Sequence, residues 1–398
     1  MNVNFVRQLL PLMSLFFVST ATTATPVVVQ APLGLPPIPV PSDNPLTQEK
    51  IDLGRRLFMD RRLSHNDTMS CAMCHVPEQG FTSNDLGAAI GIEGRTLRRN
   101  APTTFNVAYQ KTLFDDGRET HLEYQIWGPL LNKIEMGMPS VGYVVEKIRL
   151  LPEYKGLFEA AFGGPVTAER IGKALASYER TVVSGNSRFD RWYYGHDESA
   201  LNAQEQRGFK IFMGKGHCVA CHSVGEKSAL FSDQKFHNTG IGWERSMHPE
   251  RSSYEVELAP GNVVRVESHL LAAFEPPQPD VGRYEVTMNP KDRWAYKTPT
   301  LRNIALTGPY MHDGSLATLM QVINFYNHGG IDNENKSPLL VPLGLSDDDK
   351  KALVAFLMSL TGDNVPALAK DARTAPVTLA PLKEDPTDTF LRSTETTP

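Results

Sequence analysis

The sequence predicts a mainly α-helical protein of two related domains, and three observations favour this fold class. Apolar residues recur at helical spacing along much of the chain, whereas segments with alternating, strand-like spacing are few. The length of 398 residues suits two domains. One segment is also repeated, and each copy follows a cysteine motif of the same form. We therefore expect a first domain over residues 46–195 and a second over residues 196–365.

The repeated segment relates the two domains to each other. Residues 100–108 resemble residues 297–305, and Pro102 corresponds to Pro299 at an offset of 197 residues. The same offset takes Asn106 to Asn303 without a gap. The alternative is a chance match among turn-forming residues. The repeat predicts that each domain carries one copy of the same structural unit.

The N-terminal segment, residues 1–24, has the pattern of a secretory signal peptide. Arg7 supplies positive charge, residues 9–18 form a short apolar run, and residues 19–24 are small enough for cleavage. The apolar run is too short to span a bilayer well, and the alternative is an uncleaved membrane anchor. We expect export to the periplasm and no stable membrane span after cleavage.

The remaining elements follow in chain order. Residues 25–45 are rich in Pro and predict an extended linker or a strap over the surface. Thr47 and Ser346 are suited to cap the first and last helices. Helices are predicted over 48–58, within 146–183, over 201–212 and over 346–361. Residues 251–278 predict a strand pair or a loop, and residues 366–398 predict a flexible tail.

The motif C-x-x-C-H occurs twice and uses all four cysteines. This pattern is the attachment site of a c-type haem, in which the two thiols bind the macrocycle and the histidine binds the iron. A zinc site is a weak alternative, because zinc ribbons use closely spaced cysteine pairs. The sequence predicts two covalently attached haems c. The residues that hold them are Cys71, Cys74, His75, Cys218, Cys221 and His222.

The repeat also predicts that the two irons differ. The offset of 197 residues pairs Pro129 with Tyr326. Proline has no side-chain ligand, whereas a tyrosine phenolate binds ferric iron. The haem on His75 (haem 1) would then have an open position, and the haem on His222 (haem 2) would be closed by Tyr326. The alternative for Tyr326 is an ordinary buried aromatic residue. An open iron beside a closed one suggests an enzyme.

These motifs together resemble the bacterial di-haem cytochrome c peroxidases, and within them the MauG-type enzymes, over most of residues 46–362. The resemblance implies two cytochrome c-like helical domains with the haems facing a shared interface. It rests on residues 63–64, 70–75, 99–103, 116–118, 125–136, 236–239, 298–303 and 307–314.

The resemblance also implies roles for further residues. Glu135 matches a distal glutamate that assists peroxide cleavage by moving a proton between its two oxygens. Gln125 matches a distal glutamine that orients the site. A calcium ion lies between the haems in this family, and oxygen ligands suit that ion. Its matching positions here are Asn100, Thr307 and Pro309.

Three positions depart from the pattern of the classical enzymes. Ile92 stands where a distal histidine closes haem 1 until haem 2 is reduced, so haem 1 should be open from the start. Tyr326 stands in place of the methionine that closes haem 2, as in the MauG branch, with Met320 as the alternative ligand. Asp115 stands where both branches usually carry a tryptophan between the haems.

The expected activity is reduction of hydrogen peroxide at haem 1, with electrons relayed through haem 2 from a small cytochrome c or a cupredoxin. One alternative is a MauG-type oxidase that modifies or oxidises an aromatic residue of a partner protein. A non-catalytic electron-transfer cytochrome is a further alternative. The net charge of −5 argues against nucleic acid and anionic membrane surfaces as partners.

Overall fold

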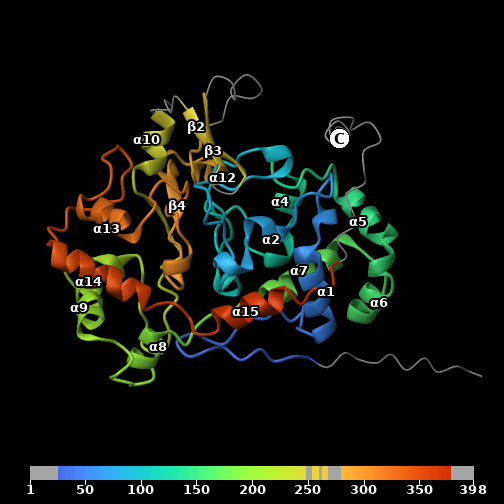
Figure 1. Cartoon of the computed structure of the whole chain (residues 1–398), viewed down its shortest axis with the longest axis horizontal. Coiled ribbons are helices and arrows are strands. Elements are labelled where there is room, and N and C mark those ends of the chain that lie inside the picture. Colours follow the sequence, from blue (N-terminus) through green and yellow to red (C-terminus); the bar gives the residue numbers. More distant parts are fainter. Residues whose placement is uncertain (1–25, 248–252, 260–261, 268–278, 378–398) are drawn as a thin grey trace, which may run out of the picture.

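The computed structural model describes residues 26–247, 253–259, 262–267 and 279–377. The predicted signal peptide and most of the predicted tail lie outside the described residues. Helices predominate in the described part of the chain, and the mainly helical class is confirmed (Figure 1). No helix within these ranges is both long enough and apolar enough to cross a membrane.

The elements are arranged in two halves that lie side by side (Figure 1). The N-terminal half contains α1 (Gln48–Met59), α2 (Cys71–Cys74), α3 (Leu122–Gln125), α4 (Trp127–Leu131), α5 (Val141–Leu150), α6 (Leu157–Phe162) and α7 (Ala168–Glu179). The C-terminal half contains α8 (Arg188–Tyr193), α9 (Ala203–Met213), α10 (Ile241–Met247), α12 (Tyr284–Thr287), α13 (Leu319–Asn327) and α14 (Asp347–Met358). A last helix, α15 (Val365–Ala372), returns to the N-terminal half.

The strands form two short antiparallel pairs. β1 (Phe236–Asn238) pairs with β4 (Ala295–Lys297), with Phe236 opposite Lys297. β2 (Ser253–Ala259) pairs with β3 (Asn262–Glu267), with Ser253 opposite Glu267. The predicted region 251–278 therefore contains a strand pair where it is described.

One helix crossing is built in the same way in both halves. α1 packs on α7, and a Cβ added at Gly54 would lie 2.0 Å from the carbonyl oxygen of Ala174. α9 packs on α14, and a Cβ added at Gly208 would lie 2.0 Å from the carbonyl oxygen of Ala352. Each glycine lets two helix backbones approach closely, just before one of the C-x-x-C-H motifs.

Two main clusters of buried apolar residues surround these crossings. The first includes Leu57, Phe58 and Leu175, and the second includes Phe212 and Phe356, all of them almost fully buried. The helical spacing of apolar residues within 48–58 and 346–361 predicts one buried face for each segment, and these apolar residues are buried in the structure. These are Ile51, Leu53, Leu57, Phe58, Leu353, Phe356, Leu357 and Leu360.

The Pro-rich segment before α1 is a strap that contacts both halves. Val27 donates a backbone hydrogen bond to Leu46, and the hydroxyl of Tyr109 donates to the carbonyl of Pro36 at 2.9 Å. The backbone N–H of Asn186 donates to Leu33, near the start of the C-terminal half. Of the two predicted forms, linker or strap, the structure has the strap.

The flexible tail predicted from residue 366 is wrong at its start, because α15 occupies Val365–Ala372. Val365, Leu368 and Ala372 are spaced three and four residues apart, which gives the helix one apolar side. That side packs on the first cluster, and Asp371 accepts a hydrogen bond from Arg55 at 3.0 Å. The Thr, Pro and Asp content beyond residue 362 hid this short pattern.

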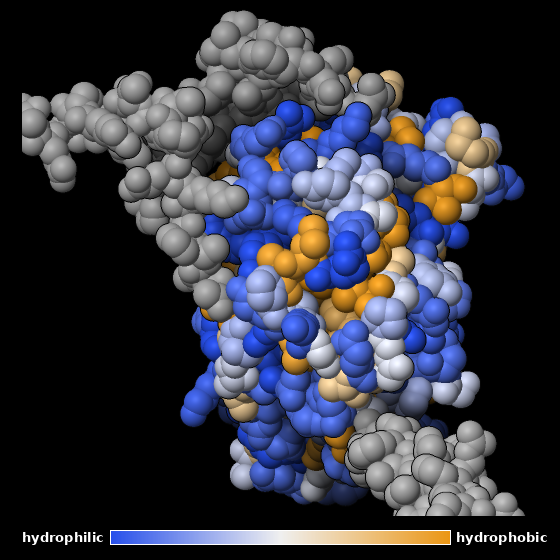
Figure 2. Space-filling view, turned by 90° about the vertical axis from the view of Figure 1, so that its right-hand side faces the viewer, coloured by the Kyte–Doolittle hydropathy of each residue, from blue (hydrophilic) through white to orange (hydrophobic). Residues whose placement is uncertain are grey.

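The outer face over α5 and α6 is mostly hydrophilic, with apolar groups between the polar side chains (Figure 2). Leu150, at the end of α5, is 68% exposed. Exposed apolar residues of this kind are common on protein surfaces. This face therefore gives no indication of function. The features that do indicate a function are found between the two halves.

Candidate haem sites

Both C-x-x-C-H motifs open into one cavity of about 590 Å³ that is lined by residues of the two halves. α2 carries the first cysteine pair, and a single 3-10 turn over Cys218–Ala220 begins the second. All four thiols are unpaired and line this cavity. Burial raises the pKa of the Cys74 and Cys221 thiols to about 11, so both are neutral near pH 7. Four free thiols facing one cavity match the covalent attachment of two haems.

The two histidines are oriented as iron ligands require. Nδ1 of His75 lies 3.2 Å from the carbonyl oxygen of Phe81, and Nδ1 of His222 lies 2.8 Å from that of Phe231. A carbonyl only accepts, so Nδ1 carries the proton and Nε2 keeps its lone pair. Burial lowers the pKa of both imidazoles, which favours the neutral form that binds a metal. Both histidines also line the cavity, so the donor set fits haem c at each motif.

Glu135 and Gln125 line the first-motif side of the cavity, together with Pro129 of α4. The side-chain amide of Asn132 donates to Oε1 of Glu135 at 2.6 Å. Burial raises the pKa of Glu135, although Asn132 and the charge of Arg118 oppose this shift. A half-buried carboxyl with a raised pKa, facing a cavity, is suited to proton transfer.

Ile92 contacts the backbone of Glu135. It is 3% exposed, and its backbone N–H donates to the carbonyl of Glu135 at 2.8 Å. The neighbouring Gly91 is also close-packed, since a Cβ there would lie 1.9 Å from the carbonyl oxygen of Ile134. Neither Ile92 nor Pro129 has a side-chain atom that can bind iron. The two positions at which the sequence predicts that no ligand closes haem 1 thus hold apolar residues.

Tyr326 lines the second-motif side of the cavity from α13. Leu319, Val322 and Ile323 line the cavity beside it, at the spacing of one helix face, whereas Met320 belongs to another face of α13. Burial raises the pKa of the Tyr326 phenol, so deprotonation there requires a nearby cation such as ferric iron. The geometry favours Tyr326 over Met320 as a side chain that reaches this part of the cavity.

The three residues matched to a calcium site line the cavity where the two halves meet. The amide nitrogen of Asn100 donates to the carbonyl of Gly87 at 3.0 Å, which leaves its oxygen for other partners. Within the described ranges, no donor reaches the carbonyl of Thr307 or of Pro309. Three neutral oxygens are a partial ligand set for calcium, which takes six to eight oxygens, some of them from water.

Asp115 lines the cavity that both motifs share and is half-buried there. Burial raises the pKa of its carboxyl, and the charges of Arg99 and Lys297 oppose this shift. The backbone N–H of Lys297 donates to the carbonyl of Asp115 at 2.8 Å, so this contact joins the two halves. An acidic side chain, and not a tryptophan, therefore occupies this position.

Several residues around the cavity escaped the sequence analysis. Arg99 binds Asp280 at 2.6 Å and Asp116 at 2.7 Å, and the ring of Tyr296 stacks on His312 with centroids 3.6 Å apart. Some of these residues lie in or next to the repeated segments, but the residues that they contact lie elsewhere in the sequence.

Glu179 is a further residue that the sequence analysis missed. It lines the cavity on α7 and is only 6% exposed. Burial raises its pKa to about 8, and the charge of Glu123 adds to this effect while that of Arg180 opposes it. One signal was present in the sequence. Glu179 follows Leu175 by four residues, which places a charge on the apolar face of a helix.

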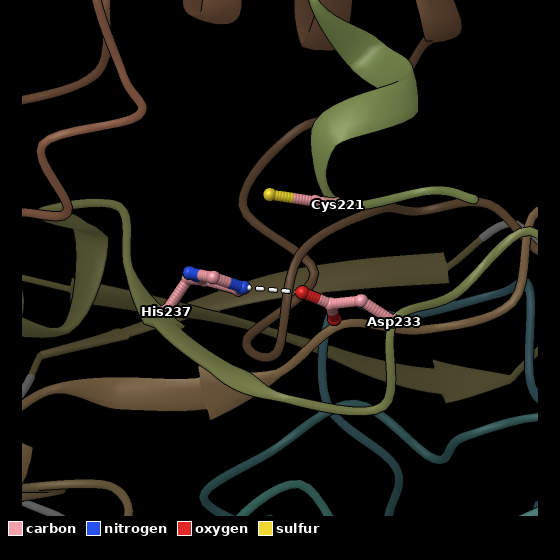
Figure 3. Close-up of side chains that lie close together, drawn as sticks. All are labelled: Cys221, Asp233 and His237. Carbon is pink, nitrogen blue, oxygen red and sulfur yellow. Dashed lines mark hydrogen bonds and ion pairs between the residues drawn. The ribbon is translucent and has the colours of Figure 1, made fainter.

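One cluster resembles a metal site but has another explanation. Cys221, Asp233 and His237 bring a thiol, a carboxylate and an imidazole within 4.8 Å of one another (Figure 3). Nε2 of His237 lies 2.9 Å from Asp233, and the thiol of Cys221 lies beside this pair. Because Cys221 belongs to the second C-x-x-C-H motif, its thiol is the group expected to attach a haem. His237 also lines the cavity, whereas Asp233 holds the His237 ring.

Comparisons with known proteins agree with this arrangement. A sequence model of the family described as di-haem cytochrome c peroxidase matches residues 48–198. The chain is 40% identical over 343 residues to the cytochrome-c peroxidase IdrP1 of Denitromonas iodatirespirans, covering 83% of this chain and 86% of that protein. It is 38% identical to the methylamine utilization protein MauG of Methylorubrum extorquens over 82% of each chain. A crystal structure of a MauG-like protein associated with microbial copper homeostasis aligns with a TM-score of 0.70 and 33% identity, covering 87% of this chain and 98% of that one.

Proposed function

The chain belongs to the family of di-haem cytochrome c peroxidases, and on that premise we propose that it reduces hydrogen peroxide at the haem attached beside His75. It is an oxidoreductase of the peroxidase type. Each peroxide takes up two electrons and two protons and yields two water molecules. We assign the peroxidatic site to residues 46–195 and the electron-transferring site to residues 196–365. The observation that carries this proposal is the half-buried carboxyl of Glu135, with its raised pKa, at the wall of the cavity.

A haem held by His75, Cys71 and Cys74 would supply the iron chemistry that breaks the bond between the peroxide oxygens. Glu135 would accept a proton from one peroxide oxygen and return it to the other. Its raised pKa brings it closer to neutral pH, where a carboxyl both accepts and donates efficiently. Asn132 holds one carboxylate oxygen at 2.6 Å and so fixes the direction of the other. Gln125, which also faces the cavity, orients the peroxide.

The difference between the two sites supports a division of labour. Pro129 and Ile92 offer no ligand at the first site, so peroxide has access without prior reduction. Tyr326 at the second site offers a phenolate, which favours the ferric state and holds the site closed to peroxide. Electrons enter from a small cytochrome c or a cupredoxin and pass through the second site.

Tyr326 also favours a second candidate function. The chain is similar to a protein named for methylamine utilization, MauG, and the tyrosine is the ligand that the MauG branch implies. In this second candidate the electrons come from an aromatic side chain of a partner protein. The two candidates share the peroxide chemistry and differ only in the electron source.

Two further assignments belong to the proposal. A calcium ion held by Asn100 and the carbonyls of Thr307 and Pro309 would join the two halves beside the cavity. The periplasm is the expected location, since residues 1–24 have the pattern of a signal peptide and bacterial haem c is attached outside the cytoplasm. Hydrogen peroxide is the small-molecule partner in each case.

The test is to mix the purified haem-loaded protein, with both irons ferric, with one equivalent of hydrogen peroxide and to follow the haem absorption by stopped flow. We expect a fast reaction without added reductant, followed by return to the starting spectrum when reduced cytochrome c or cupredoxin is supplied. No reaction until one electron has been added would contradict the open first site. Reaction without turnover by either donor would favour the partner-protein function.

A further inference from the structure

The two histidines use their backbone acceptors unequally. The carbonyl of Phe81 receives Nδ1 of His75 at 3.2 Å, and it also receives the backbone N–H and the hydroxyl of Thr104, at 3.1 and 3.4 Å. The carbonyl of Phe231 receives Nδ1 of His222 at 2.8 Å, and no other donor in the described residues reaches it. A shorter, undivided hydrogen bond gives an imidazole more electron density.

The internal repeat explains why the second carbonyl has no competing side-chain donor. At an offset of 197 residues, Thr103 corresponds to Thr300, and each hydroxyl donates to the carbonyl just before the phenylalanine, at 2.6 and 2.7 Å. The next position changes from Thr104 to Leu301, which has no hydroxyl to donate. The carbonyls of Pro102 and Pro299 lie near the respective imidazoles, but that feature is common to both sites.

The following position in the repeat changes from Phe105 to Arg302. Phe105 packs edge-on against the ring of Phe81, with centroids 5.1 Å apart. Arg302 instead places a guanidinium 5.7 Å from the ring of Phe231. Its Nε donates to the carbonyl of Ala229 at 2.6 Å, two residues before Phe231. The second site thus replaces an apolar contact by a charged one.

The guanidinium of Arg302 is buried, and each of its nitrogens has a hydrogen-bond partner. Arg302 is 1% exposed, and its two terminal nitrogens bind the carboxylate of Asp190 at 2.8 and 2.9 Å. One of them also donates to the carbonyl of Gly34 in the strap at 2.6 Å. The same Gly34 carbonyl receives the backbone N–H of Ala229 at 3.0 Å. The strap therefore joins Arg302 to the segment that ends at Phe231.

Gly34 is the residue that this arrangement requires. Its φ is +85°, and a Cβ there would lie 1.9 Å from Oδ1 of Asp190 and 2.8 Å from a terminal nitrogen of Arg302. Any larger residue would displace the ion pair. The Pro-rich strap therefore contributes an acceptor that holds Arg302 in place.

We propose that Arg302, held by Asp190 and the Gly34 carbonyl, is a positioning residue that fixes the segment ending at Phe231, whose carbonyl serves His222 without a competing hydroxyl because Leu301 replaces threonine, and so lowers the reduction potential of haem 2. The proposal rests on the function proposed above, in which His222 is an iron ligand. Arg302 acts through position and not through net charge, because the buried pair with Asp190 is neutral overall. A lower potential at the second site fits its role beside the phenolate of Tyr326.

Two variants test this in the haem-loaded protein. Arg302→Lys keeps the charge but loses the two-pronged contact and the bond to Ala229. Leu301→Thr gives the second site the competing hydroxyl of the first. We expect each variant to raise the reduction potential of haem 2 by about 59 mV. For a one-electron couple this corresponds to about a tenfold change in the ratio of reduced to oxidised haem. Haem 1 should not change. Thr104→Val is the matched control, and it should lower the haem 1 potential alone.

The measurements are spectroelectrochemical titration of both haems, low-temperature EPR of the ferric protein, and amide hydrogen exchange at residues 229–231. Unchanged haem 2 potential and EPR signals in Leu301→Thr, with both haems attached, would overturn the proposal. If Arg302→Lys fails to fold, Leu301→Thr decides the question, because it leaves the ion pair in place. Peroxide reactivity of the unmodified protein is measured on the same samples. If the proposed function is wrong, the unmodified protein will not react with peroxide. If only the proposal about Arg302 is wrong, that reactivity will remain.

Discussion

Replacing Glu135 by glutamine is the sharpest change that the site allows. Glutamine keeps the size of the side chain and an oxygen that accepts the 2.6 Å hydrogen bond from Asn132. It removes only the exchangeable proton. The side chain is half-buried and is held by Asn132, and a mobile water does not replace a positioned proton donor and acceptor. We therefore expect Glu135→Gln to leave the haem content and the fold unchanged and to slow the reaction with peroxide.

The size of the loss follows from the role. A positioned general acid and base contributes about 10²- to 10⁴-fold to a rate. The charge of Arg118 acts on Glu135 and remains in the variant, so part of the stabilisation of the site survives. We expect a loss of about 10³-fold, equivalent to about 4 kcal/mol at about 1.36 kcal/mol per factor of ten.

The assay is the second-order rate constant for peroxide with the ferric protein, measured by stopped flow. Glu93→Gln is the matched control, because it makes the same chemical change at an exposed carboxylate. Glu93 follows Ile92, whose backbone N–H donates to the carbonyl of Glu135. The control therefore also shows whether a change in this turn alters the rate. A loss of less than about threefold in Glu135→Gln, with normal haem content, would refute the role of Glu135 as acid and base.

Three further predictions concern stability and metal binding. Burial raises the pKa of Glu179 to about 8, above the ~4.3 of an unfolded chain, so the folded protein keeps a proton that the unfolded chain has lost. This stabilisation is complete below about pH 4 and is lost as pH rises through 8, so Glu179→Gln should flatten the decline of the melting temperature over that range. Gly54→Ala should lower the free energy of unfolding by about 1–3 kcal/mol, because the added methyl group overpacks against Ala174. Gly142→Ala should not, since the nearest atom lies 3.9 Å from the added Cβ. Chemical denaturation measures both variants. Chelation of calcium should slow the peroxide reaction, and added Ca²⁺, but not Mg²⁺, should restore it.

Much of the fold could be predicted because its signals are local. Helical spacing placed α1 and α14 with their buried faces, and Thr47 and Ser346 cap them as expected. The C-x-x-C-H motifs place their cysteines and histidines on one cavity because the chemistry of haem attachment fixes that spacing. The repeat paired Pro129 with Tyr326 as equivalent positions, and both residues line the cavity.

The parts that escaped prediction depend on contacts between distant segments. The strap contributes the Gly34 carbonyl to Arg302, 268 residues away in sequence. α15 packs on the opposite half of the molecule from the helix that precedes it. The burial of Glu179 depends on α7 facing the cavity, which one helix pattern alone does not show. Such features arise when separated segments meet, and a pattern along one segment carries little information about its partner.

The claim at the centre of this account is that the two irons differ, with an open site above His75 and a site closed by Tyr326 above His222. The most direct measurement is low-temperature EPR of the ferric protein and of its Tyr326→Phe variant. We predict one high-spin and one low-spin haem in the unmodified protein, and two high-spin haems in the variant. Two low-spin haems in the unmodified protein would contradict the open first site. A low-spin signal that persists unchanged in Tyr326→Phe would contradict the assignment of Tyr326.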